Sequence, residues 1–291
     1  MDVKRSVMIL NNVIALLMCL FLSGACIADE GKKGGPREKS IIAGNEIYSL
    51  SALDVQSTRI FPVLQEELDE IVHSRISAED AVRISEITRY TFFSKLGARE
   101  AITAALARNL SEGEQRIVLE WLRSDIGGKI TLLERAAAQP EARAGVVAYS
   151  KKLQHKPLSM KRTLLMQKFK RKIINKGALD RIIVVTEAVK KLAEEYAYGG
   201  RHLSYEKSLK KTVKFIDVVR ATVNRRLFNH IRYSYRDLGD GELKNYLDFI
   251  SSDTGQKYLA VSLHAFADAV ERAGKRMGAD IEAMAASGRK R

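Results

Sequence analysis

Two stretches of this 291-residue chain are near-copies of one another, and they limit the folds open to it more than any other feature. They are residues 110–129, LSEGEQRIVLEWLRSDIGGK, and residues 238–257, LGDGELKNYLDFISSDTGQK. Eight of the twenty aligned positions are identical, and five more keep their chemical character. The chain is therefore predicted to contain two copies of one structural unit.

Each copy has the pattern of a helix, a turn and a second helix. Apolar residues recur at helical spacing in its first half, and Ser-Asp-x-Gly-x-Lys follows. Ser124 and Ser252 are expected to cap the second helices, because a serine oxygen can accept a hydrogen bond from a free backbone N–H. Asp125 and Asp253 would then lie in the first turn, next to the positive end of the helix dipole.

Gly127 and Gly255 fall just inside these second helices. A glycine there costs about 1 kcal/mol relative to alanine, so its presence in both copies indicates the close approach of another backbone. A helix N-terminus with Lys129 or Lys257 could instead bind an anion. The aspartate in the same turn already supplies a negative charge, so the structural interpretation is favoured.

The aromatic residues three positions before each serine are expected to be buried at equivalent sites. If Phe249 is a core residue, its replacement by alanine should cost about 3–5 kcal/mol. The full set of predicted motif residues is Trp121, Ser124, Asp125, Gly127, Lys129, Phe249, Ser252, Asp253, Gly255 and Lys257.

This motif resembles that of a bacterial family of exported, all-helical proteins, the domain-of-unknown-function family two-zero-five-nine. The family pattern is an aromatic residue followed by Ser-Pro-x-Gly-x-Lys between two helices. Phe249, Ser252, Gly255 and Lys257 match it, as do their counterparts in the first copy, but Asp253 and Asp125 replace the proline. The resemblance covers only the two copies. It implies an all-helical exported protein and brings no catalytic residue.

Composition also favours an all-α protein. The chain has only four prolines, and no stretch after residue 40 shows sustained apolar–polar alternation. Two related helical repeat units, 41–153 and 158–286, are predicted to form a bundle-like array, followed by a basic tail at 287–291. The longest clean helical pattern runs over residues 209–231.

Residues 1–28 resemble a secretion signal, with Lys4 and Arg5 before an apolar run and small residues after it. This predicts export to the periplasm. An uncleaved anchor is the alternative, although the apolar run is short for a membrane span. Residues 29–40 are polar and glycine-rich, and a flexible leader is expected there.

Cys26 follows Gly-Ala, as in a bacterial lipoprotein signal, but Ser23 stands where such signals normally have leucine. Two outcomes stay open, which are lipidation of Cys26 with membrane anchoring, and ordinary cleavage after Ala25 or Ala28. The chain after residue 26 has no cysteine, which excludes an internal disulfide and a thiolate metal site from the mature protein.

No sequence pattern of a known catalytic site is present. The chain has no GxSxG, P-loop or HExxH pattern, and its five histidines lack metal-ligand spacing. His264 and Asp268 are interpreted as a surface pair on one helix. The sequence therefore predicts no catalytic residue, no metal and no cofactor. Two alternatives stay open, an envelope enzyme with a site of scattered carboxylates and tyrosines, and a carrier of a hydrophobic ligand between helices.

The charge distribution gives the one prediction that concerns function. The net charge is +14, and no Asp or Glu occurs between Glu141 and Asp180. Apolar residues at helical spacing within this stretch, from Met160 through Leu164 to Phe169, are expected to form a buried side. A basic amphipathic helix of this kind predicts docking on anionic lipid or an acidic envelope protein. The alternative is a core helix with solvated lysines, and export makes nucleic acid an unexpected partner. The candidate contacts are Lys161, Arg162, Lys168, Lys170, Arg171, Lys172 and Lys176.

Overall fold

The computed structural model describes residues 36–55, 57, 68, 77–90, 97–174, 176–199 and 203–287. The predicted signal segment, with Cys26, and the last four residues lie outside this part. Within it the chain is helical and contains no strand, so the predicted all-α class is confirmed.

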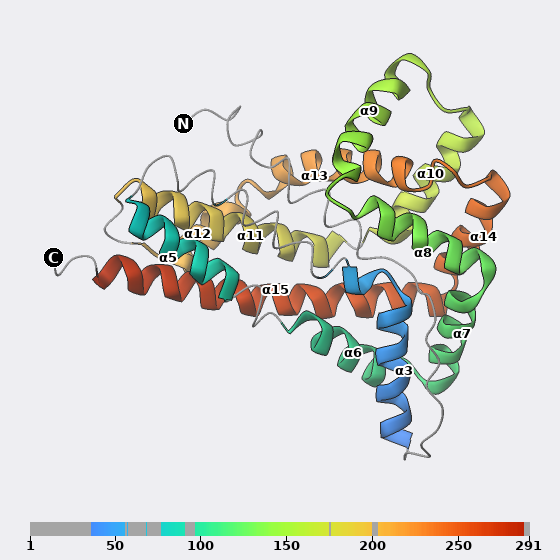
Figure 1. Cartoon of the computed structure of the whole chain (residues 1–291), viewed down its shortest axis with the longest axis horizontal. Helices are drawn as coiled ribbons and strands as arrows, with labels where there is room; N and C mark the ends of the chain where they lie inside the picture. The colour runs from blue at the N-terminus through green and yellow to red at the C-terminus, as the bar shows by residue number, and fades with distance from the viewer. Residues whose placement is uncertain are drawn as a thin grey trace.

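The helices, labelled as in Figure 1, are α3 (Pro36–Leu50), α5 (Ala78–Thr88), α6 (Ala98–Asn109), α7 (Glu112–Arg123), α8 (Asp125–Ala137), α9 (Ala142–His155), α10 (Met160–Ile173), α11 (Lys176–Ala197), α12 (Tyr205–Val213), α13 (Ile216–Ser234), α14 (Asp240–Ser251) and α15 (Asp253–Ser287).

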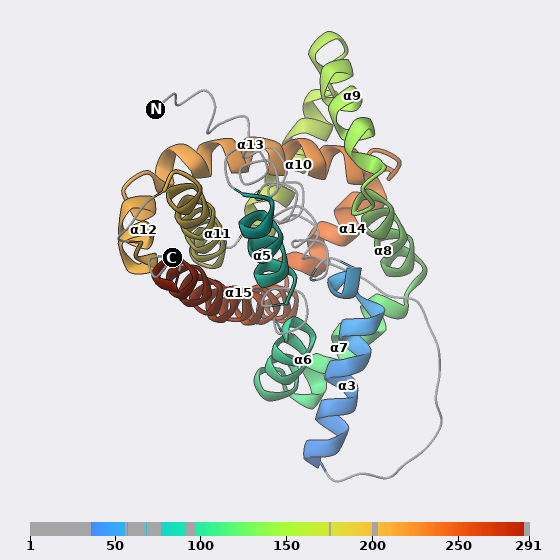
Figure 2. The same cartoon turned by 60° about the vertical axis from the view of Figure 1, so that its left-hand side comes forward.

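The long helix α15 organises the packing. It runs along the molecule, with α11 and α12 on one side and α6 on the other (Figures 1 and 2). Small side chains cover much of its length, and Ala267, Ala269 and Ala273 are fully buried. Such side chains let neighbouring helices approach closely. Because α6 belongs to the first predicted unit and α15 to the second, one continuous apolar core joins both units.

The first helix of the described residues begins earlier than expected. Residues 36–40 were expected to belong to a flexible leader, but α3 starts at Pro36, a residue suited to the first helical position. Ser40 is held in place, because its hydroxyl donates to the carbonyl of Ala107 at 2.7 Å and accepts from Gln115 at 2.8 Å.

The predicted continuous helix over 209–231 is wrong. It breaks at Lys214 and Phe215 into α12 and α13, and Phe215 has a non-helical conformation with φ −112° and ψ 7°. After the break, α12 packs on α11 and α15, whereas α13 keeps contact with α11 and also packs on α8, α9 and α10. The break therefore accompanies a change of partners from α15 to α8, α9 and α10, while α11 contacts both helices.

The hairpin formed by α9 and α10 protrudes from the rest of the molecule (Figures 1 and 2). Both of its helices pack on α13. None of the residues of α9 is fully buried, so this helix is attached along one side only.

Candidate functional site

The two motif copies form the same corner. In each, one serine joins two helices, Ser124 between α7 and α8 and Ser252 between α14 and α15. The backbone angles agree closely, with φ −69° and ψ 154° at Ser124 and φ −67° and ψ 157° at Ser252. The common origin of the two units stays a prediction, but the local geometry is the same.

Each serine hydroxyl bonds both helices of its corner. Ser124 Oγ accepts from the N–H of Gly127 at 3.1 Å and donates to the carbonyl of Trp121 at 2.6 Å. Ser252 Oγ makes the matching bonds to Gly255 at 3.0 Å and to Phe249 at 2.7 Å. The expected caps are present, and each also satisfies a carbonyl at the end of the preceding helix.

The two glycines permit the close backbone approach that the sequence indicates. A Cβ atom on Gly127 would lie 2.0 Å from the carbonyl oxygen of Trp121. On Gly255 it would lie 2.1 Å from the carbonyl oxygen of Phe249. Neither corner has room for any side chain at this position.

The two corners also bind one another reciprocally. Lys129 of the first copy bonds Glu242 of the second at 2.6 Å, and Lys257 of the second bonds Glu114 of the first at 2.7 Å. Reciprocal contacts of this kind characterise a two-fold interface. They also leave both motif lysines engaged within the chain, which argues against the alternative of anion binding at these helix ends.

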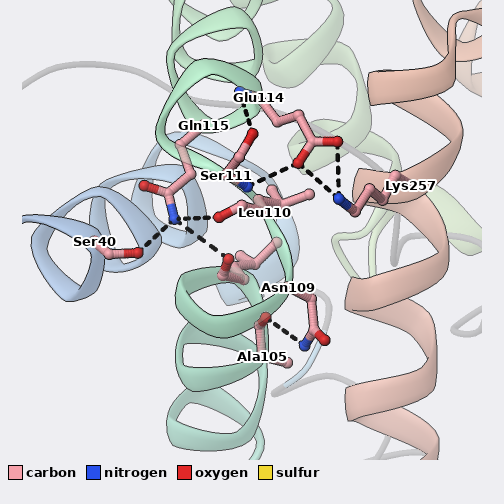
Figure 3. A network of polar contacts seen from close by, with 9 residues as sticks. Ser40, Ala105, Asn109, Leu110, Ser111, Glu114, Gln115 and Lys257 are labelled. Atoms are coloured by element: carbon pink, nitrogen blue, oxygen red, sulfur yellow. Dashed lines mark hydrogen bonds and ion pairs between the residues drawn. The ribbon is translucent and has the colours of Figure 1, made fainter. Parts of the chain in front are cut away.

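Each of these glutamates has a second role. Glu114 accepts the N–H of Ser111 at the start of α7, and Glu242 accepts the N–H of Gly239 at the start of α14, both at 2.7 Å. Figure 3 shows Glu114 between Ser111 and Lys257. Each glutamate therefore caps its own helix and pairs with the lysine of the other copy.

The pKa values of both glutamates lie below their ordinary value. For Glu114 the main cause is the hydrogen bond from Lys257, followed by the one from Ser111. For Glu242 the causes are the matching bonds from Lys129 and Gly239. The stabilisation is present above the unfolded pKa of about 4.5 and is lost as the pH falls through the lowered folded pKa. Because the pairs face solvent, they specify how the corners meet more than they stabilise the fold.

The motif aromatics lie between the corners. Trp121 and Phe249 stack with ring centroids 4.5 Å apart and planes 7° from parallel. Both are only partly buried and cover the edge of the core. The expected burial of the two aromatics is therefore corrected to partial burial, because each packs on the other ring and on the edge of the core, and Trp121 also stacks on Tyr246 with centroids 5.9 Å apart.

Replacing Phe249 with alanine should cost about 2 kcal/mol, less than the truncation of a fully buried ring. Trp121 is the only tryptophan of the chain, so its fluorescence reports on this contact directly. We expect its emission to move to longer wavelength as water reaches the exposed face of the indole, and urea denaturation to give the stability change. Phe249→Leu, which keeps apolar cover, is the control. An unchanged emission in the alanine variant would contradict the stacking.

The seven cations predicted to form a binding surface differ in their exposure and in their contacts. Arg162 is a structural residue, because its side chain is only 12% exposed and donates to Asp240 at 2.9 Å and to the carbonyl of Tyr235 at 2.7 Å. Lys170 is half-buried, with its ammonium 5.2 Å from the ring centroid of Phe228. The others are exposed, namely Lys161, Lys168, Arg171, Lys172 and Lys176.

The buried side of α10 agrees with the expected one only in part. Phe169 is buried as expected, together with Met166 and Ile173, but Met160 and Leu164, also expected in the core, are 75% and 50% exposed. The three buried residues follow one another at spacings of three and four, which defines a single helix side, and Met160 and Leu164 fall opposite to it. These two apolar side chains therefore share the outer side of α10 with its lysines.

The charge of the molecule is concentrated on the helices around this hairpin. Residues 142–176, which cover α9 and α10, contain eleven Lys or Arg and no Asp or Glu. Residues 216–236, which cover α13, contain five Arg and one Asp. Eleven charges from the first segment and a net four from the second exceed the +14 of the whole chain, so the remainder is close to neutral. We call the exposed side of α9, α10 and α13 the basic face.

A buried carboxylate and two tyrosines meet in the interior. Glu134 of α8 accepts hydrogen bonds from the hydroxyls of Tyr235 and Tyr246, and all three are buried. The pKa of Tyr246 is raised, first by burial and then by the charge of Glu134. The sequence pattern gives no sign of this cluster, because Glu134 lies 101 and 112 positions from the two tyrosines, and only Tyr246 belongs to a motif copy. The carboxylate and tyrosines of this cluster are the residue types expected for an envelope enzyme. Because all three side chains are buried, the cluster has the character of a polar network in the core.

A groove of about 360 Å³ lies between α6 and α15. Its walls include His264 and Asp268 over a floor of alanines, and its polar residues are exposed. Asp268 pairs with Arg181, which also binds Glu271 at 2.6 Å. The groove is thus open and polar at the rim, unlike an enclosed apolar cavity for a hydrophobic ligand.

Within the described ranges, no three His, Cys, Asp or Glu side chains are grouped as metal ligands. In the same part of the chain, no helix is long and apolar enough to cross a membrane. Comparisons with protein-family models, with curated proteins and with solved structures find no match. The resemblance of the motif to the exported bacterial family therefore stays a prediction.

Proposed function

We propose that this chain is an exported, non-catalytic interaction module of the bacterial cell envelope that docks on an anionic membrane surface through its basic face. The observation that supports this most is that residues 142–176 and 216–236 together hold as much positive charge as the whole chain has net, and that the helices within them, α9, α10 and α13, pack together. A solvated core helix explains scattered lysines, but it does not explain why three adjoining helices carry almost no acidic residue.

The basic face has a fixed framework under its exposed cations. Arg162 ties α10 to Asp240 of α14. Arg220 ties α13 to Asp180 of α11 through two bonds, at 2.6 and 2.8 Å. The exposed lysines and arginines of α10 are thereby presented on a rigid support. Near an anionic membrane each such charge contributes about 1 kcal/mol, over a Debye length of about 8 Å at physiological salt.

Lipid fits this face better than an acidic protein does. Met160, Leu164 and Val147 are at least half exposed, and they lie on the same two helices as the cations. Apolar side chains intermixed with lysines characterise helices that lie in a membrane interface.

The test uses residues 29–291, which exclude the apolar signal segment and contain all the described helices. This chain is sedimented with neutral phosphatidylcholine vesicles and with vesicles that also contain phosphatidylglycerol, over a salt series. We expect binding to the anionic vesicles at low salt and release as the salt concentration rises, because salt screens exposed charges. Equal binding to neutral vesicles, or no binding at low salt, would contradict the proposal.

A further inference from the structure

We infer that the tip of the α9–α10 hairpin inserts apolar side chains into the bilayer, with Met160 and Leu164 below the level of the lipid phosphates. This rests on the proposed function, since it specifies how the basic face meets the membrane. Electrostatic adsorption alone would leave the whole protein above the headgroups, so insertion is a separate and separately testable property.

The tip of the hairpin, where α9 connects to α10, projects away from the rest of the described chain (Figures 1 and 2). Its connecting residues Lys156, Pro157 and Ser159 are exposed, and Met160 follows at the start of α10 with 75% of its surface in water. A projecting, solvent-exposed methionine gains nothing from the fold, because no described element covers it. Burial among acyl chains would remove that apolar surface from water.

Met160 and Leu164 lie one helical turn apart on the outer side of α10. Lys161 and Lys168 flank them and are exposed. Lysine stems are long enough for the ammonium groups to stay beside lipid phosphates while the neighbouring apolar side chains reach deeper. The arrangement therefore fits a bilayer that contains anionic phospholipid. A soluble acidic protein would satisfy the lysines and leave the two apolar side chains without a matching environment.

The tip is also preorganised. Ser159 caps α10 by accepting the N–H of Arg162 at 3.2 Å, and the Arg162 side chain fixes the first turn to Asp240. On the inner side Phe169 packs on Tyr235 and Tyr246, with centroids 4.9 and 4.8 Å away. The helix is therefore formed before it meets lipid, which reduces the ordering cost of binding.

A tryptophan placed at the tip tests insertion directly. Residues 29–291 with Trp121→Phe, which keeps an aromatic ring on Phe249, give a background without tryptophan, and Leu164→Trp adds the reporter. With vesicles containing phosphatidylglycerol we expect its emission to move to shorter wavelength and to be quenched by lipids brominated on their acyl chains. Ile42→Trp in the same background is the matched control, because Ile42 is 52% exposed on α3, at the opposite end of the molecule in both views. It should show neither change.

A second measurement uses no tryptophan substitution. Met160→Ser with Leu164→Ser should weaken binding to the anionic vesicles about tenfold or more, because two exposed apolar side chains are lost while every charge remains. The salt dependence of the remaining binding should be unchanged. Met160→Trp replaces the first reporter if Leu164→Trp fails to fold by circular dichroism.

The outcomes separate the two proposals. If the protein adsorbs but the reporter at 164 stays in water, insertion is overturned and electrostatic docking stands. If the protein does not adsorb at all, both are overturned. A shift at position 42 equal to that at position 164 would also overturn insertion by this tip.

Discussion

Replacing Gly127 with alanine is expected to destabilise the protein by about 3 kcal/mol or more, whereas the same replacement at the adjacent Gly128 should be neutral or stabilising. The added methyl at 127 would meet the backbone oxygen of Trp121 at 2.0 Å, and a backbone atom of a packed helix cannot move aside as a side chain can. At Gly128 nothing lies within 4 Å, and alanine is the better helix former by about 1 kcal/mol. Urea denaturation of the two variants measures the difference.

The second corner provides an independent repetition. Gly255→Ala places its methyl 2.1 Å from the oxygen of Phe249 and should be as damaging, while Gly241→Ala, in open space at the start of α14, should be tolerated. If all four variants had similar stability, the account of the corners as tight backbone contacts would be wrong. If only one corner were sensitive, their equivalence would be wrong.

The two helix–turn–helix corners could be predicted from the sequence, because the contacts that form them join residues close together in the chain. The serine caps and the glycine contacts involve residues within six positions of each other, and both copies repeat them. The crossed pairing of Lys129 with Glu242 joins residues 113 positions apart, so no local pattern shows it. A signal was nevertheless present, because the glutamate and the lysine are each identical in both copies, and opposite charges repeated in this way can pair between copies.

Which side of a helix faces the core is harder to predict from the sequence. The apolar residues of α10 outnumber those that one helix side can bury, so composition did not decide which side faces inward. The aromatic cluster of Tyr235 and Tyr246, supplied by other helices, selects the side with Phe169 and leaves Met160 and Leu164 outside. The break between α12 and α13 has a similar cause, since it depends on where the packing partners lie. The charge pattern of the sequence therefore predicts the basic face, whereas the exposure of Met160 and Leu164 at its tip is seen only in the structure.

The basic face itself is tested by removing its charges without changing the fold. In residues 29–291, glutamine replaces four exposed cations of α10, namely Lys161, Lys168, Arg171 and Lys172. A control variant loses the same number of charges from exposed positions on α3, α6 and α15, namely Lys39, Arg108, Arg272 and Lys275. Thermal unfolding should show little change in either variant, because all eight side chains face solvent.

Partition onto vesicles containing phosphatidylglycerol, at low salt, then tests the central claim most directly. At about 1 kcal/mol for each charge beside an anionic membrane, the α10 variant should bind about a hundredfold to a thousandfold more weakly than the unaltered chain. The control variant should stay within about threefold, since its lost charges lie on helices outside the basic face. Equal losses in the two variants would mean that net charge alone governs adsorption, and no loss in the α10 variant would mean that its cations are ordinary solvated surface.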